Sequence, residues 1–105
     1  MATHLKSLAK GAVPTSQIAV YTVPAAKAAA VKNLRFVNTG STVTVNAFFR
    51  RTASGTPVRI LDKDKQVAAG LTNYTDEFFL EADDRIELIA SSAIDYVISG
   101  TERDQ

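Results

Sequence analysis

Apolar and polar residues alternate along much of this chain, most clearly in residues 41–51. One face of this segment would carry apolar side chains, and the opposite face mostly polar ones. The first set is Val43, Val45, Ala47 and Phe49, and the second is Thr44, Asn46, Phe48 and Arg50. A period of two over this length predicts a half-buried β-strand and excludes an amphipathic helix.

The same reasoning predicts strands elsewhere, separated by segments rich in Gly, Pro, Asn, Asp and Ser. The expected strands are residues 18–23, 31–37, 58–61, 71–80, 85–90 and 93–100. The expected turns and loops are residues 25–30, 38–40, 53–57, 62–65, 68–70, 81–84 and 91–92. The Ala-rich residues 25–30 are interpreted as a turn, because so short a helix is marginal in water and the segment follows Pro24. Asn38-Thr-Gly40 is interpreted as a hairpin turn.

Within residues 85–90, Ile86 and Leu88 are expected to face the core, and Arg85 and Glu87 to point outward. Within the last strand, Ile94, Tyr96 and Ile98 share one face.

Seven or eight short strands joined by turns predict an all-β fold, namely an antiparallel β-sandwich or jelly-roll-like domain, with a barrel as the alternative. Residues 1–16 lack alternation and are expected to form an N-terminal arm. Residues 17–102 would be the β-sandwich domain, and residues 103–105 a polar tail.

Composition narrows the class of protein further. The chain has 105 residues, of which 46% are hydrophobic and 22% charged, as expected for one soluble globular domain. It contains no cysteine, which excludes disulfides, thiol nucleophiles and cysteine-based zinc sites. There is no apolar run long enough to span a membrane, and the N-terminus is not that of a signal peptide. We therefore expect synthesis in a cytoplasm and no membrane partner.

The charges are distributed unevenly, although the formal net charge is only +1. Residues 1–61 contain eight basic residues and no acidic one, whereas residues 62–105 contain all eleven acidic residues. The small net charge gives no general bias toward nucleic acid, and we expect no nucleic-acid partner. The segregation has two explanations. Early and late strands could interleave and neutralise each other, or two oppositely charged faces could dock head to tail between copies or onto a host lattice.

Residues suited to catalysis are few. The single histidine, His4, lies in the expected arm, and without a second histidine or a cysteine a zinc site is not expected. Asp62 and Asp64 alternate with lysines and lack the glycine and glutamate of a calcium loop. No glycine-rich phosphate-binding motif is present. We expect no enzyme activity, no metal and no cofactor.

Two groups of residues are candidates for binding a partner. Leu5, Lys6, Leu8 and Lys10 lie in the expected arm, where a short amphipathic turn could form on a partner surface. Arg50 and Arg51 follow Phe48-Phe49, a pairing of charge and aromatic rings that resembles a platform for single-stranded nucleic acid. The favoured explanation is a strand end, with one phenylalanine in the core and the arginines in solvent.

Several motifs resemble those of small bacteriophage virion proteins. Val20-Tyr-Thr-Val-Pro-Ala25, then Lys27, then the strand ending in Val37-Asn-Thr, resembles their "Tyr-Thr-Val-Pro-Ala-Gly-Lys" followed by "Val-Asn-Thr". Leu80-Glu-Ala-Asp-Asp-Arg-Ile86 is similar to their turn "Leu-Glu-Ala-Gly-Asp-x-Ile", and residues 95–100 to their last strand. Ala26 and Asp83 stand where that family usually has glycine, which suggests positive φ at both positions.

The resemblance covers residues 18–102 and implies a non-enzymatic part of the virion, commonly a symmetric oligomer. The first hypothesis is a capsid decoration (cement) protein, assembled in the host cytoplasm as a homotrimer or other symmetric oligomer. It would bind the major capsid protein or another virion protein, and the arm would clamp neighbouring subunits. The alternatives are a neck, fibre or tail-associated component, or a carbohydrate-binding module, which would need exposed tyrosines.

Overall fold

The computed structural model describes residues 3–51, 55–75 and 77–104, and these residues form ten strands and no helix. The described part of the chain therefore holds no helix that could cross a membrane. The strands are β1 (Thr3–Ala12), β2 (Ile18–Thr22), β3 (Lys27–Asn38), β4 (Val43–Arg51), β5 (Val58–Arg59), β6 (Lys65–Val67), β7 (Gly70–Tyr74), β8 (Phe78–Leu80), β9 (Asp84–Ala90) and β10 (Asp95–Asp104).

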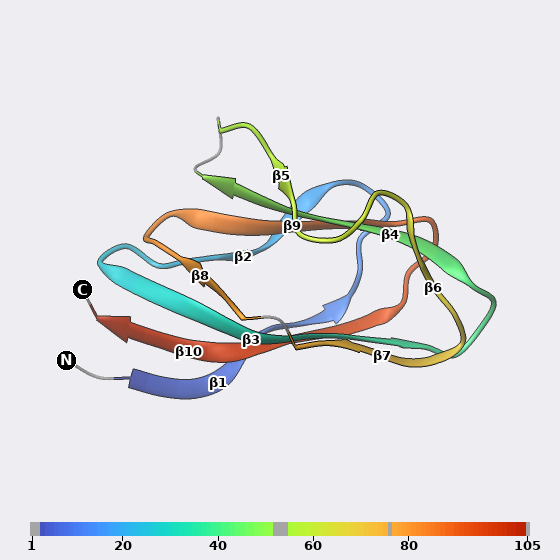
Figure 1. Cartoon of the computed structure of the whole chain (residues 1–105), viewed down its shortest axis with the longest axis horizontal. Coiled ribbons are helices and arrows are strands. Elements are labelled where there is room, and N and C mark those ends of the chain that lie inside the picture. The colour runs from blue at the N-terminus through green and yellow to red at the C-terminus, as the bar shows by residue number, and fades with distance from the viewer. Residues whose placement is uncertain (1–2, 52–54, 76, 105) are drawn as a thin grey trace.

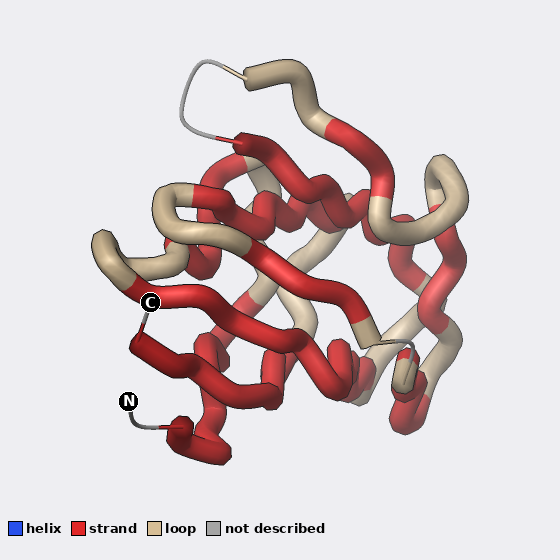
Figure 2. The backbone as a smooth tube through the Cα atoms, turned by 60° about the vertical axis from the view of Figure 1, so that its left-hand side comes forward, coloured by secondary structure: helices blue, strands red, loops and turns tan. Residues whose placement is uncertain are grey.

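The strands form two antiparallel sheets that pack face to face (Figure 1). Sheet A has the order β1-β10-β3-β7, with β8 also pairing with β3. Sheet B has the order β2-β9-β4-β5, with β6 also pairing with β4. Because β5 and β6 share one neighbour, and β7 and β8 share another, the ten strands occupy eight positions. The chain alternates between the sheets in the manner of a jelly roll, which confirms the predicted fold class. In Figure 2, the described residues are coloured as strand and loop, with no helix among them.

The core lies between the sheets and is built by the alternation that the sequence displays. Val43, Val45 and Ala47 of β4 are buried, as are Ile86 and Leu88 of β9. From β10 and the loop before it come Ile94, Tyr96 and Ile98, and β3 adds Phe36, which is fully buried. Burying an aliphatic or aromatic side chain of this size contributes about 1.5–3 kcal/mol, so the apolar faces of the strands account for the sandwich.

The expected N-terminal arm is instead part of sheet A. Strand β1 pairs antiparallel with β10 from Thr3 opposite Arg103 to Ala12 opposite Asp95. The register shifts between Ser7 and Ala9, and Gly11 has φ 145°. A bulge puts an extra residue into the strand and so breaks the two-residue alternation. This irregularity explains why the sequence pattern did not reveal the strand.

The expected polar tail also differs, because Arg103 and Asp104 belong to β10 and pair with Ala28 and Lys27 of β3. Residues 1–2 of the expected arm and residue 105 of the expected tail lie outside the described residues.

Four local predictions need correction. The segment expected as a turn at residues 25–30 is a turn only at residues 25–26, because β3 begins at Lys27. The turn at Asn38 does not close a hairpin, because it joins β3 of sheet A to β4 of sheet B. The strand expected at residues 71–80 is two strands, β7 and β8, on either side of residue 76, which lies outside the described residues. The loop expected at residues 62–65 ends one residue early, because β6 begins at Lys65. Residues 52–54, which include part of the turn expected at 53–57, also lie outside the description.

The strand topology brings the basic first half of the chain beside the acidic second half. Basic residues from the first half pair with acidic residues from the second half across neighbouring strands. These ion pairs are Lys27–Asp104, Lys32–Glu77, Arg50–Glu87, Arg51–Glu81 and Arg51–Asp84. The pairing matches the explanation in which early and late strands interleave, since β3 lies beside β10 and β4 beside β9.

Candidate functional site

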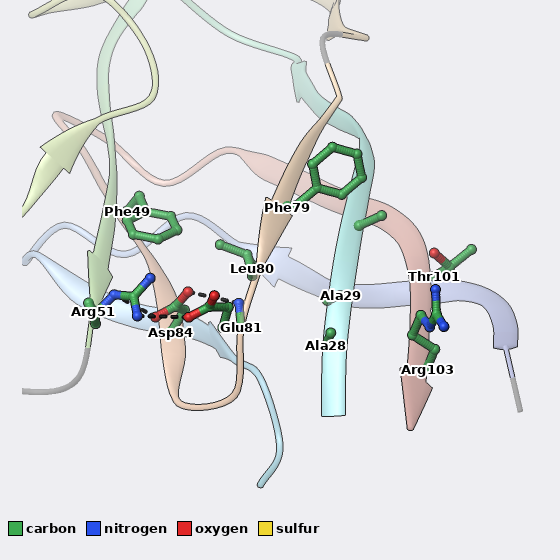
Figure 3. A pocket seen from close by; sticks show the side chains of 11 residues that line it. Ala28, Ala29, Phe49, Arg51, Phe79, Leu80, Glu81, Asp84, Thr101 and Arg103 are labelled. Atoms are coloured by element: carbon green, nitrogen blue, oxygen red, sulfur yellow. Dashed lines mark hydrogen bonds and ion pairs between the residues drawn. The ribbon is translucent and has the colours of Figure 1, made fainter. Parts of the chain in front are cut away.

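A hollow of about 480 Å³ lies at the end of the sandwich where β3 begins and β4 and β10 end. Figure 3 shows the side chains that line it. We call it the β8 hollow, because its residues lie on both sides of this short edge strand. They are Ala28, Ala29, Ala30, Phe49, Arg51, Phe79, Leu80, Glu81, Asp84, Thr101 and Arg103.

The alternation of β8 divides this lining into two parts. Leu80 is buried and faces the interior of the sandwich, toward Phe49 of β4. Phe79 points the other way, onto the outer face of sheet A, and its side chain is 71% exposed. Beside it lie Ala28 and Ala30, whose small side chains leave a shallow strip along β3. The hollow thus has an apolar inner wall and an apolar outer strip.

The inner part ends in a polar corner made by Arg51, Glu81 and Asp84 (Figure 3). Nη1 of Arg51 donates a 2.8 Å hydrogen bond to Oε2 of Glu81. Asp84 is almost fully buried, and its Oδ2 accepts a 2.8 Å hydrogen bond from the backbone N–H of Glu81. Its other oxygen, Oδ1, lies 3.7 Å from Nε of Arg51. The hydrogen bond with Glu81, together with the charge of Asp84, raises the pKa of Arg51 above its ordinary value.

This corner fixes the turn between β8 and β9. Asp83, at the tip of the turn, has φ 70°, and the N–H of Asp84 donates to the carbonyl of Glu81 at 3.1 Å. The carboxylate of Asp84 therefore orders the backbone of the turn, and Arg51 covers that carboxylate. The geometry is that of a structural ion-pair cluster, because each charged group is already engaged with another group of the chain.

The six residues predicted to bind a partner do not come together. Leu5 and Lys6 lie in β1, and their side chains fall outside the description. Leu8 is half-buried against the core, and Lys10 is exposed opposite Val97 of β10. β1 belongs to sheet A and β4 to sheet B, so this first group and Arg50–Arg51 lie on different sheets.

Arg50 and Arg51 also separate from each other, because neighbouring residues of a strand point to opposite faces. Arg51 enters the β8 hollow, whereas Nε of Arg50 lies 3.1 Å from Oε2 of Glu87. Glu87 was expected to point to solvent but is only 8% exposed. Arg50 and Gln17 cover it, and Nε2 of Gln17 donates a 2.9 Å hydrogen bond to its Oε1.

The aromatic platform expected beside these arginines is occupied within the chain. The guanidinium of Arg59 lies 4.9 Å from the centre of the Phe48 ring, and Phe49 packs against the core. This matches the favoured explanation of a strand end. The arginines do not simply enter solvent, however, because both form ion pairs with acidic residues of the chain.

Sequence reasoning missed the outer part of the hollow, namely Ala28, Ala30, Phe79, Thr101 and Arg103. One signal was available: two adjacent phenylalanines in a strand must point to opposite faces, so Phe78 or Phe79 had to lie outside the core. Phe78 packs on the core and Phe79 is exposed. The remaining residues could be found only from the pairing of β3 with β8 and β10.

A second hollow, of about 440 Å³, lies at the opposite end between residues 37–43 and 91–95. Five serine and threonine residues are among those that line it, and Asp95 adds one carboxylate. Within residues 3–51, 55–75 and 77–104, no group of three His, Cys, Asp or Glu side chains could hold a metal ion.

The three tyrosines do not form an exposed aromatic platform. Tyr21 and Tyr96 are buried, and Tyr74 is half-buried with its ring 6.2 Å from that of Phe36. Burial raises the pKa of all three hydroxyl groups above the ordinary value.

Comparison of the sequence with protein-family models found no match, and neither did comparison with curated proteins. Among solved structures, the fold is similar to that of a chain in the structure of infectious bursal disease virus Gx strain, with a TM-score of 0.55 and 11% sequence identity. The match covers 96% of this chain but only 31% of the viral chain, so this chain spans less than a third of that protein. At this identity, the likeness establishes a shared β-sandwich fold.

Proposed function

We propose that this chain is a non-enzymatic structural protein of a virus particle. The observation that carries the proposal is the similarity of nearly the whole jelly roll to a chain of a virus structure. Three of its charged side chains fit such a role, because Arg51, Glu81 and Asp84 at the β8 hollow bind one another and stabilise a turn. A rigid block of this kind contributes through its outer surfaces, where it contacts neighbours in an assembly.

Within that class, we propose a bacteriophage virion protein, and specifically a decoration protein on the outer shell. The support is the resemblance of the motifs around Pro24 and Asp84 to those of small phage virion proteins. Both positions at which that family usually has glycine adopt positive φ, namely 64° at Ala26 and 70° at Asp83. Glycine favours this conformation, so the backbone here suits the family's residues although the side chains differ.

The mechanism proposed for a decoration protein is the sum of many weak contacts, each bridging adjacent shell subunits. The N-terminal clamp expected from the sequence is not part of this mechanism, because residues 3–12 form strand β1 of sheet A. Among the described strands, β1 pairs with β10 alone, which leaves its outer edge open for a strand of the major capsid protein or another virion protein. Lys10 lies on this strand, so that the edge carries at least one exposed positive charge.

Copy counting in purified particles tests the proposal and its alternatives. A decoration protein should be present in numbers comparable to the major capsid protein, whereas a neck, fibre or tail component should be present in a few copies. Purified protein should also bind shells that lack it, to saturation, and raise the temperature at which they open. Heat-denatured protein is the matched control. Absence from purified particles would refute a virion role, and a few copies would refute decoration.

A further inference from the structure

We propose that a cavity lined by Tyr74 binds a small neutral molecule that has a compact apolar body and one hydrogen-bond acceptor. The cavity has a volume of about 130 Å³, and we call it the Tyr74 cavity. It lies between β3, β7 and β8 of sheet A and the loop that joins β5 to β6. Its lining residues are Leu34, Ile60, Leu61, Tyr74, Glu77 and Phe78. The site goes beyond the proposed function and does not depend on it.

The strand register turns the sheet A part of this lining toward the interior of the sandwich. Leu34 and Tyr74 are pairing partners in β3 and β7, so their side chains lie on the same face of the sheet. Leu34 is buried, and the Tyr74 ring meets the fully buried ring of Phe36 edge to face. Phe78 of β8 packs against the same core. The Tyr74 ring therefore points between the sheets.

The opposite wall is the loop between β5 and β6, which is fixed on β4 at both ends. The N–H of Ile60 donates to the carbonyl of Ala47 at 2.9 Å. The N–H of Asp64 donates to Oδ1 of Asn46 at 2.9 Å, and the Asn46 amide donates in return to Oδ1 of Asp64 at 3.1 Å. Between these anchors, Leu61 packs against the core. The cavity is therefore preformed, and a ligand does not have to order this wall when it binds.

The Tyr74 hydroxyl provides one specific polar contact for a ligand. Its oxygen is buried and has no hydrogen-bond partner within the described residues. Burying a hydroxyl without a partner is costly, because its hydrogen bonds to water are lost and not replaced. A ligand atom that accepts a hydrogen bond from this hydroxyl recovers that cost. The unsatisfied group therefore favours a molecule with an acceptor over an entirely apolar one.

The remaining polar groups favour a neutral ligand. The negative charge of Asp62 lies near enough to add to the effect of burial, which raises the pKa of Tyr74 above its ordinary value. Glu77 is exposed and forms an ion pair with Lys32 of β3. Both carboxylates would repel an anion. The Tyr74 hydroxyl is thus the polar side-chain group of the lining that remains for a ligand.

The volume of the cavity limits the size of the ligand. An apolar cavity of about 150 Å³ in another protein binds one benzene molecule, so the Tyr74 cavity suits a single ring of that size. Water is a poorer occupant, because a buried water usually makes about two to four hydrogen bonds. The lining side chains other than Tyr74 and Glu77 are apolar. We therefore infer a compact molecule with a carbonyl, an ether or an aromatic nitrogen as its acceptor.

NMR titration of the isotope-labelled full chain tests the inference with pyridine and benzene as probes. The two molecules have similar size and shape, but only the pyridine nitrogen accepts a conventional hydrogen bond. Both should bind, with nuclear Overhauser contacts to the methyl groups of Leu34, Ile60 and Leu61. Tyr74→Phe should weaken pyridine by about tenfold and leave benzene unchanged or slightly tighter. Absence of binding by either probe would overturn the inference, as would an equal effect of Tyr74→Phe on both.

Tyr21→Phe is the matched control for the lost hydroxyl, because Tyr21 is also buried but donates to Glu102. It should leave the affinities of both probes unchanged. Circular dichroism melts check that each variant folds. A loss of pyridine affinity in folded Tyr21→Phe equal to that in Tyr74→Phe would refute the role given to the Tyr74 hydroxyl.

A larger side chain in the cavity provides a second test. Leu61→Phe should weaken both probes by about tenfold or more, because the added ring occupies the space that they need. Val58→Phe is its control, since Val58 is 60% exposed on β5 and does not line the cavity. Unchanged binding in a folded Leu61→Phe variant would show that the probes bind elsewhere.

The outcome is separable from that of the proposed function. Pyridine binding that depends on Tyr74, in a protein that is absent from virus particles, would support the cavity and refute the virion role. A chain that decorates shells but binds neither probe would support the proposed function and refute the cavity.

Discussion

The hydroxyl of Tyr21 in β2 donates a 2.5 Å hydrogen bond to Oε2 of Glu102 in β10, and both side chains are buried. Since β2 belongs to sheet B and β10 to sheet A, this bond joins the two sheets across the core. A hydrogen bond to a charged acceptor is shorter and about twice as strong as one between neutral groups. This buried hydrogen bond, which we call the polar clasp, therefore links two layers that otherwise meet through apolar side chains.

Tyr21→Phe should lower the free energy of unfolding by about 1.5–3 kcal/mol, because it leaves the buried carboxylate of Glu102 without this donor. Urea unfolding followed by circular dichroism measures the change. Tyr74→Phe is the matched control, because the Tyr74 hydroxyl is buried and has no hydrogen-bond partner within the described residues. That substitution should be neutral or stabilising, and equal losses in the two variants would contradict the role given to Glu102.

The same clasp should make stability depend on pH in the alkaline range. Burial, and then the hydrogen bond and charge of Glu102, raise the pKa of Tyr21 above its ordinary value. The folded state thus holds this proton more tightly than the unfolded state, where tyrosine ionises near pH ~10. The contribution of Tyr21 is therefore complete below that pH and is lost above it.

The measurement is the difference in unfolding free energy between the unmodified protein and Tyr21→Phe, at neutral pH and at pH values above ~10. The difference should shrink as the pH rises. Lysines and the other tyrosines titrate in both proteins and cancel in this comparison. A difference that stays constant would show that Tyr21 does not titrate differently in the two states.

The strands with regular alternation could be predicted from sequence, and those with irregular pairing could not. Residues 41–51 and 85–90 were identified because one face of each strand is buried along most of its length. Strand β1 was missed because the bulge near Leu8 breaks its pattern and because its partner, β10, lies at the far end of the chain. No local signal indicates that such a segment will find a partner there.

The candidate site was harder to predict for the same reason. Arg51 was named from its position beside Phe49, but its partners Glu81 and Asp84 come from a turn 30 residues or more away. The outer part of the β8 hollow depends on Ala28 and Ala30 of β3, which lies between β8 and β10, and only the pairing of β3 reveals this position. The positive φ at Ala26 and Asp83 could be predicted from the sequence, because the family that these motifs resemble usually has glycine at both positions.

Ala26→Gly should stabilise the fold, because Ala26 adopts φ 64° in the turn before β3. An L-residue pays roughly 1–2 kcal/mol in this region, and glycine loses up to about 1 kcal/mol through its more flexible unfolded state. We expect a net gain of about 0.5–1 kcal/mol in urea unfolding. Ala25→Gly, one residue earlier, is the control and should destabilise, since Ala25 is not among the residues with positive φ.

Asn38→Ala should destabilise the loop that joins the two sheets by about 2–3 kcal/mol. The buried amide of Asn38 donates to the carbonyls of Ser41 and Val67 at 2.8 and 2.9 Å. Its Oδ1 accepts the N–H of Gly40 at 2.9 Å. Thermal melts of both variants measure the change. Thr39→Ala, at an exposed position beside Asn38, should leave stability unchanged. A loss below about 0.5 kcal/mol for Asn38→Ala would contradict this role, because that is the usual scale of surface substitutions.

Arg50→Met should cost about 2–3 kcal/mol, because it keeps much of the aliphatic stem but leaves the buried carboxylate of Glu87 without its cation. Lys27→Met removes a cation whose ion pair with Asp104 is exposed, and should cause no measurable change. The decisive variant is Glu87→Gln in the Arg50→Met background, which removes the buried charge and should recover part of the lost stability. If the second substitution adds to the loss instead, packing of the Arg50 stem, and not the charge of Glu87, dominates at this position.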